Sequence, residues 1–242
     1  MNYLILTLIA IVITLNSYGQ RVQIDTLVVP VTSSFARPNT KLRFPVLRTG
    51  NEEVDKVMNN DLKNRYTDNE FIDKPTDSTL ILWADETLVH LSFGVTYMRN
   101  NLLSFTIYSE GCGAYCSSWT DYFTYNTKTG KYISISDVVD TLGEFRTKVY
   151  ADLAKQFKQQ KEELRADSRI ADDKETYEWA LRCYEDIERY FSIEPFVLNS
   201  EHLEIIVRCD MPNAIKNLTP IINLNYRYDD IMKYLKLKHL KW

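Results

Sequence analysis

The chain has 242 residues, of which 45% are apolar and 26% are charged, and its formal net charge is −4. This composition is typical of one globular domain with a sizeable core, and it excludes a disordered or fibrous protein. The charge balance is mildly acidic and no stripe of Lys and Arg is present. Because phosphate binding needs clustered cations, we expect no nucleic-acid partner.

The N-terminus is an unbroken apolar run from Tyr3 to Leu15, followed by the small residues Ser17 and Gly19. The run is too short to cross a bilayer, and the pattern is typical of a secretory signal peptide. We expect cleavage after Gly19. The alternative is an uncleaved anchor, because no Lys or Arg precedes the run.

This interpretation places the mature protein outside the cytoplasm, in the periplasm or the extracellular space. No cysteine directly follows the apolar run, so a lipoprotein acceptor is missing. We expect residues 1–19 to be the signal peptide and residues 20–242 to form a single cell-envelope domain. No stable membrane insertion is expected after cleavage.

The next part of the chain is predicted to hold a strand, an irregular segment, a helix and a polar loop, at residues 22–31, 37–48, about 52–66 and 68–78. The helix is indicated by apolar residues at helical spacing. Thr49 and Glu52 form its expected capping box.

The middle of the chain alternates apolar and polar residues, which indicates antiparallel strands with one wet face. A meander of at least four strands is predicted at residues 87–98, 102–109, 119–126 and 131–136. Asp137, after the last of these strands, is expected to act as a turn or capping residue.

Two helices should follow, at about residues 142–164 and 174–191, the first capped by Thr141 with Glu144. Strands at residues 193–198, 202–209 and 220–226 and a short helix at residues 229–237 complete the chain. These elements predict an α+β fold, in which an antiparallel sheet of the meander and the C-terminal strands has helices packed on one side.

The four cysteines permit three disulfide pairings. Cys209 alternates with apolar strand residues, and Cys183 lies on the apolar face of a predicted helix. Export favours disulfides, so we expect Cys183 to pair with Cys209 and Cys112 to pair with Cys116. The alternative is a set of buried free thiols.

Metal and nucleophilic chemistry have little support in the sequence. His90, His202 and His239 have no partner at ligand spacing, and HExxH is absent. Cys112 and Cys116 are four residues apart and do not form a CxxC motif. GxSxG, SxxK and glycine-rich phosphate loops are also absent. We expect no metal and no cofactor.

Carboxylates offer one route to catalysis. Glu110 and Asp121 border the loop EGCGAYCSSW on adjoining strands, and a facing pair would suit glycoside hydrolysis. The alternative is that each is a solvent-facing strand residue.

Aromatic residues are the strongest positive signal, because exposed Tyr and Trp offer large contact area at low entropic cost. They flank the same loop: Tyr108, Tyr115, Trp119, Tyr122 and Tyr125. Part of this set is expected to be core. The predicted binding residues are Glu110, Tyr115, Trp119, Asp121 and Tyr122.

The order of short motifs resembles a known extracytoplasmic domain family. The matching residues are Leu103, Ser104, Gly113, Ala114, Tyr125-Asn126, Thr129-Gly130-Lys131 and Asp137, preceded by Pro45, Asn59 and Asn60. The closing segments PFVLNSEHLEIIV and INLNYRYDDIMKYL are similar to the family's final strands and helix. The resemblance runs from about Phe44 to Leu237.

This family is that of the C-terminal domain of the lysozyme-binding anti-sigma factor RsiV, also found in the N-terminal region of the peptidoglycan deacetylase PdaC. The resemblance implies an α+β domain of unknown function that binds rather than catalyses. One relative binds lysozyme, and most members have no known ligand. Tyr115 stands where the family usually has histidine, with cysteines on either side.

The function predicted from residues and resemblance together is that of an exported, non-catalytic envelope domain that binds a lysozyme-like protein or a peptidoglycan-type glycan. One alternative is a small envelope enzyme acting on glycan through Glu110 and Asp121. Another is a structural accessory protein.

Overall fold

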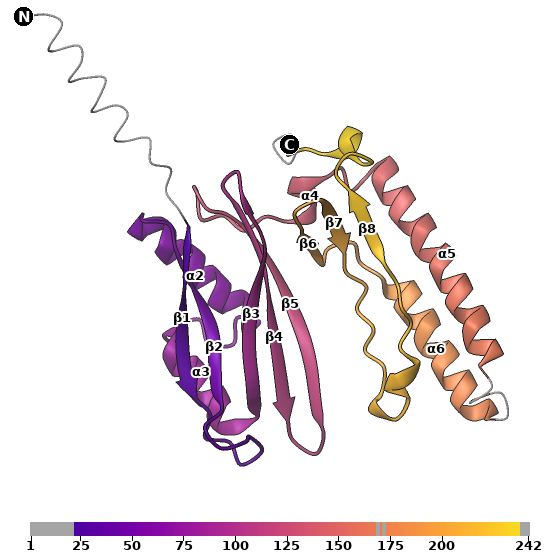
Figure 1. The fold of residues 1–242 in the computed structure, drawn as a ribbon, viewed down its shortest axis with the longest axis horizontal. Helices are drawn as coiled ribbons and strands as arrows, with labels where there is room; N and C mark the ends of the chain where they lie inside the picture. The colour runs from indigo at the N-terminus through magenta and orange to yellow at the C-terminus, as the bar shows by residue number, and fades with distance from the viewer. Residues whose placement is uncertain (1–21, 168–169, 171–172, 238–242) are drawn as a thin grey trace, which may run out of the picture. The chain divides into compact units, whose positions relative to one another are not determined.

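The computed structural model describes residues 22–167, 170 and 173–237. The predicted signal peptide lies outside these residues. None of the helices in the described part of the chain has the length and apolar character needed to cross a membrane. The fold is α+β, as predicted, and its strands form three antiparallel sheets of two, three and three strands (Figure 1).

The described chain divides into two compact units made of interleaved segments. The first unit holds residues 22–92, 109–118 and 127–131, and the second holds residues 93–108, 119–126 and 132–237. Strands β3 (Leu88–Arg99), β4 (Leu102–Cys112) and β5 (Cys116–Asn126) therefore contribute residues to both units. The single domain expected for residues 20–242 stays a prediction.

The first unit opens with strands β1 (Gln23–Pro30) and β2 (Lys41–Arg48), which pair antiparallel. The irregular segment predicted at residues 37–48 is therefore wrong over residues 41–48 and confirmed over residues 37–40. Pro45 suggested it, but this proline costs no ladder bond. The N–H of Leu47 donates to Oδ1 of Asn59 at 2.8 Å and so points away from β1. Pro45 is two residues earlier on the same strand, so its backbone nitrogen points the same way, away from the hydrogen bonds to β1.

Helix α2 (Glu52–Tyr66) has the predicted bounds, but its N-cap is different. The side chain of Asn51 accepts from the N–H groups of the first turn, so the Thr49–Glu52 capping box is wrong. Thr49 instead donates its N–H and its hydroxyl to Oδ1 of buried Asp55, at 2.6 and 2.7 Å. These bonds tie the start of α2 to the end of β2.

Helix α3 (Thr76–Glu86) was missed by the sequence analysis, which placed a polar loop at residues 68–78. It begins after Pro75 without a side-chain capping bond, and few of its residues are buried, Leu80 and Ala84 among them. The sequence therefore carries only a weak signal for the start of this helix and only a weak pattern of apolar residues at helical spacing.

The three-stranded sheet has the order β3-β4-β5. Asn100 and Asn101 join β3 to β4 with φ values of 53° and 59°, as a two-residue hairpin turn requires. The fourth meander strand is wrong. Tyr132 forms only an isolated bridge to Tyr125, and helix α4 (Ile135–Val138) follows, closed by the capping box of Ser134 with Asp137.

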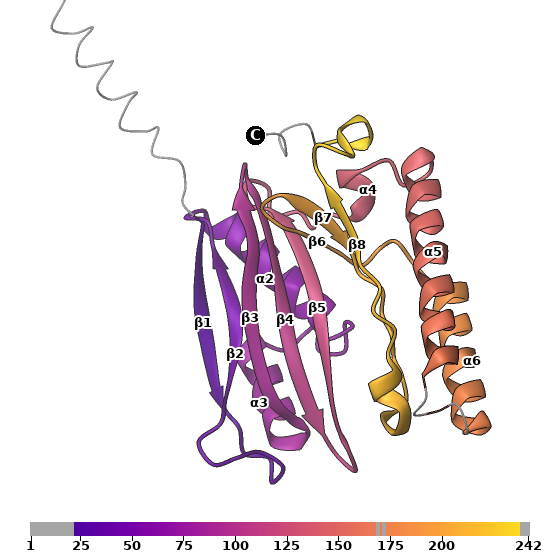
Figure 2. The ribbon, with the colours of Figure 1, turned by 45° about the vertical axis from the view of Figure 1, so that its right-hand side comes forward.

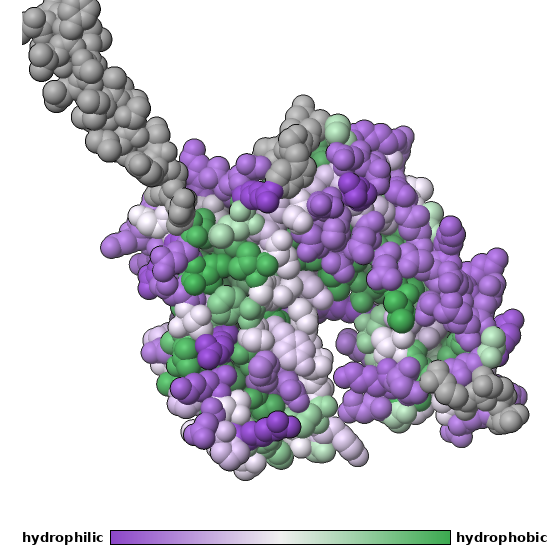
Figure 3. Space-filling view, viewed as in Figure 1, coloured by the Kyte–Doolittle hydropathy of each residue, from purple (hydrophilic) through white to green (hydrophobic). Residues whose placement is uncertain are grey.

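The second unit contains helices α5 (Glu144–Ala166) and α6 (Lys174–Tyr190) and strands β6 (Phe196–Leu198), β7 (His202–Ile205) and β8 (Leu224–Arg227). The strands form an antiparallel sheet of order β6-β7-β8, and the two helices lie side by side in both ribbon views (Figure 2). The outer surface of α5 is hydrophilic (Figure 3).

Two smaller predictions fail in this unit. The N-cap of helix α5 is Gly143, which makes no side-chain capping bond, so the box of Thr141 with Glu144 does not form. The predicted C-terminal helix is only the short 3-10 helix η2 (Met232–Tyr234); a second one, η1 (Asn213–Leu218), precedes β8. The core of the unit is rich in aromatic rings, including fully buried Phe145 and Phe157.

Candidate functional site

The turn between β4 and β5 is closed by the predicted disulfide between Cys112 and Cys116. Inside this loop the N–H of Gly113 donates to the carbonyl of Tyr115 at 3.2 Å. Cys112 is buried, whereas the side chain of Tyr115 at the tip is 78% exposed. The loop therefore presents one large aromatic side chain on a covalently closed turn.

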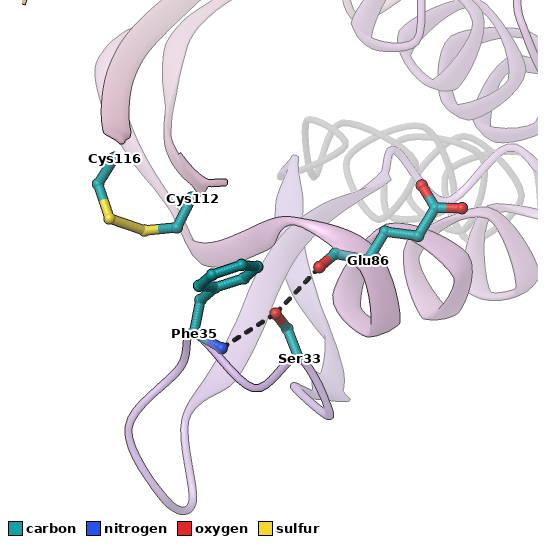
Figure 4. Close-up of a disulfide and its surroundings, with 5 residues drawn as sticks. All are labelled: Ser33, Phe35, Glu86, Cys112 and Cys116. Carbon is teal, nitrogen blue, oxygen red and sulfur yellow. Dashed lines mark hydrogen bonds between the residues drawn. A yellow bond between two sulfur atoms is a disulfide. The ribbon is translucent and has the colours of Figure 1, made fainter. Parts of the chain in front are cut away.

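The C-terminal end of helix α3 anchors this turn. A helix end leaves backbone carbonyls without helical partners. Here the N–H of Ser33 donates to the carbonyl of Ala84 at 3.0 Å, and the N–H of Cys112 donates to that of Thr87 at 2.8 Å. The hydroxyl of Ser33 donates to the carbonyl of Glu86 at 3.0 Å (Figure 4). The segment after β1 and the end of β4 are thus fixed to the same helix end.

A second aromatic side chain, Phe35, lies beside the disulfide (Figure 4). Its N–H donates to the hydroxyl of Ser33 at 3.4 Å, and its ring is 55% exposed. Phe35 was not among the binding residues predicted from the sequence. The available signal was an aromatic residue within the polar, proline-containing stretch SSFARP.

Glu110 lies next to the disulfide. One of its carboxylate oxygens and the sulfurs of Cys112 and Cys116 all lie within 4.8 Å of one another. Three such atoms resemble a metal-ligand set, but bonded sulfurs are not thiolates and do not ligate as thiolates do. We call Phe35, Glu110, Cys112, Tyr115 and Cys116 the hairpin tip, an exposed aromatic surface with one carboxylate.

The register of β4 and β5 decides which other predicted residues share a face. The hydroxyl of Thr124 donates to that of Ser104 at 3.0 Å, so these residues are cross-strand neighbours. The bonded pair Cys112 and Cys116 has the same register. Because side chains alternate along a strand, even-numbered residues of both strands lie on one face and odd-numbered residues on the other.

The five predicted binding residues therefore divide between the two faces of the strands. Glu110 and Tyr122 have even numbers, whereas Trp119 and Asp121 have odd numbers. Glu110 and Asp121 consequently point to opposite faces and do not form the facing carboxylate pair that glycoside hydrolysis requires. This geometry disfavours the enzyme alternative.

Asp121 and Tyr122 have their own partners in the second unit. Oδ1 of Asp121 lies 3.5 Å from Nη2 of Arg208, in a partly exposed ion pair. The pKa of Tyr122 is raised, mainly by burial and further by the nearby carboxylate of Glu204. Trp119 is 42% exposed. These residues lie outside the hairpin tip.

The expected bridge between Cys183 and Cys209 is wrong, because both are free thiols. Residues 206, 208 and 210 line a cleft together with Cys183. Cys209 does not line this cleft, and its thiol lies 3.9 Å from the carbonyl of Val207. Burial raises the pKa of Cys209 to about 11, so its reactive thiolate is scarce at neutral pH.

Removing the hairpin-tip disulfide by the double change Cys112→Ala and Cys116→Ala is expected to lower the free energy of unfolding by about 2 kcal/mol, the chain-entropy value for so short a loop. Urea unfolding of both proteins measures this difference. Hydrogen exchange at Gly113 should accelerate in the variant, because the turn loses its covalent closure. An unchanged stability together with unchanged exchange would contradict a bracing role.

The assignment of one disulfide and two free cysteines is checked by titrating the thiols of the unfolded, unreduced chain. Two reactive thiols are expected, Cys183 and Cys209. A count of zero would restore the Cys183–Cys209 bridge.

Comparisons with known proteins place the fold but give no activity. No family model matches the sequence, and no curated protein matches it. The solved structures that are similar over nearly the whole chain include two DUF3298 family proteins. A DUF3298 family protein from Bacteroides fragilis has 14% identity and a TM-score of 0.55, and the match covers 90% of this chain and 94% of that one.

The second is a DUF3298 family protein from Pseudomonas aeruginosa, with 13% identity and a TM-score of 0.55 over 91% of this chain and 97% of that one. Likeness at such identity concerns the fold alone. The chain therefore has a fold similar to that of DUF3298 family proteins.

Proposed function

We propose that this protein is an exported, non-catalytic cell-envelope domain that binds a protein partner through the hairpin tip. The observation that carries the proposal is the pair of exposed aromatic side chains, Phe35 and Tyr115, at a disulfide-closed turn. Rigid aromatic side chains are typical anchors of protein interfaces, because they bury large areas at low entropic cost.

The way in which the tip is held supports this role. Its backbone is bonded to the end of α3 from two separate segments, so little order has to be gained on binding. Tyr115 lies exposed at the tip of a turn, so its side chain could insert into a concave surface of the partner. The family resemblance adds the class of partner, a lysozyme-like protein.

The experiment is a binding titration of a c-type lysozyme against protein produced from its full-length gene. The double change Phe35→Ala and Tyr115→Ala is expected to weaken binding by about 100-fold or more, as loss of two aromatic anchors does. Trp179→Ala is the matched control, since Trp179 is an aromatic residue that is 38% exposed and belongs to the second unit.

The outcomes separate the alternatives. Equal affinity of wild type and double variant would reject the hairpin tip as the interface. Binding to peptidoglycan but to no lysozyme would reject the proposed class of partner and favour the glycan.

A further inference from the structure

We propose that a cleft beside helix α6 binds a lysine or arginine side chain from an extended segment of a partner protein. The cleft lies wholly within the second unit and shares no residue with the hairpin tip. This proposal does not rest on the proposed function.

Two regular faces form the walls of the cleft. Residues 183, 186, 187 and 190 of α6 line one wall, at the spacing of one helix face. Residues 206, 208 and 210, which follow β7 in the chain, line the other. The cavity volume is ≈ 350 Å³, which is in the range of ligand pockets in proteins.

The inner surface of the cleft is apolar. Ile187 and Phe191 come from the end of α6 and the residue after it, and Pro195 and Ile206 lie where the chain enters β6 and leaves β7. The N–H of Ile206 donates to the carbonyl of Pro195 at 2.7 Å, which holds the two segments together. A surface of this kind suits the methylene stem of a long basic side chain.

The rim supplies the charge that selects a cation. Asp186 and Asp210 face the cleft from opposite walls, and both are exposed. Neither carboxylate has a hydrogen bond or an ion pair within the described part of the chain. Arg208 also lines the cleft, but its charge is balanced by Asp121 at 3.5 Å.

An aromatic ring completes the recognition. Tyr190 lines the cleft and is 75% exposed, so its face is accessible to an incoming cation. Cations bind to such faces with modest energy, which adds to the attraction of a nearby carboxylate. The cleft therefore offers an apolar surface for a methylene stem, and carboxylates and an aromatic ring for a positive group. A lysine or arginine side chain has both of these parts.

The test uses the blocked tripeptide acetyl-Leu-Lys-Leu-amide as the probe and the whole protein as the receptor. Methyl NMR should show saturable shifts confined to the cleft, at Ile187 and Ile206. The double change Asp186→Asn and Asp210→Asn should raise Kd about tenfold, the sum of two exposed charge interactions. The peptide with glutamate in place of lysine should cause no such shifts.

Controls keep this result distinct from binding at the hairpin tip. Tyr115→Ala should leave the peptide affinity unchanged, whereas Tyr190→Ala should weaken it. The asparagine variant changes exposed side chains, so an unchanged NMR spectrum elsewhere will show that it folds. Equal affinity of wild type and asparagine variant, or equal binding of the glutamate peptide, would overturn the proposal.

Discussion

Replacing Lys63 with methionine is expected to lower the free energy of unfolding by about 3 kcal/mol, because a buried, charge-assisted bonding network is lost. Lys63 is 5% exposed on helix α2. Its ammonium group donates to the carbonyls of Phe71, Ile72 and Lys74 at 2.9, 2.7 and 2.7 Å. Methionine has similar length but no donor, so these carbonyls lose their partner.

The effect should extend to the proposed interface. The carbonyls bonded by Lys63 lie in the turn that leads into helix α3, and the end of α3 holds the hairpin tip. The ring of Phe71, in this turn, lies 5.9 Å from the ring of Trp83, which is on helix α3. We therefore expect changed tryptophan fluorescence and weaker lysozyme binding as well as lower stability.

Lys56→Met is the matched control, because Lys56 is exposed on the same helix. Its free energy of unfolding should change by less than about 0.5 kcal/mol, as for most surface substitutions. Denaturant unfolding of the two variants measures both values. A loss at Lys63 no larger than that at Lys56 would contradict the network.

Phe157→Ala is expected to cost about 4 kcal/mol of unfolding free energy, since it leaves a large cavity in the core of the second unit. Phe157 is fully buried on α5, and its ring lies 6.2 Å from that of Tyr184 on α6. The hydroxyl of Tyr184 donates to the carbonyl of Leu218 at 2.7 Å. The lost ring therefore supports both helices.

Phe35→Ala provides the control with the same chemical change at an exposed position. Its ring is 55% exposed, so its unfolding free energy should change by less than about 0.5 kcal/mol. This result would also show that the Phe35→Ala half of the double binding variant leaves the fold intact. In the Phe157→Ala variant, the tripeptide should no longer shift the methyl signals of the cleft, because helix α6 would be displaced. A cost below about 1 kcal/mol would show that the core closes around the missing ring, contrary to the usual range.

Local sequence signals predicted helices and strands well where apolar residues recur regularly on one face of the element. Helices α2 and α6 have nearly the predicted bounds, because their apolar residues recur at helical spacing. The same signals failed where packing or capping competed. Residues 131–136 alternate like a strand, but the capping box of Ser134 with Asp137 turns the chain into α4.

The site divides in the same way. The closed turn and the exposed Tyr115 were predictable, because both depend on residues close together in the chain. Phe35 was not, since more than seventy positions separate it from the disulfide beside it. The predicted face of five residues was too large, because alternation sends Asp121 and Glu110 to opposite sides of the strands.

The sequence by itself determined the α+β class, the hairpin with its disulfide and the aromatic character of the turn. These depend on periodicity, turn residues and short-range covalent geometry, which act over a few residues. Only the tertiary structure decided that the end of α3 holds the tip, that Cys183 and Cys209 stay apart, and that two carboxylates face one apolar cleft. Each of these requires segments distant in the chain to meet, and no local pattern records which partner a buried group will find.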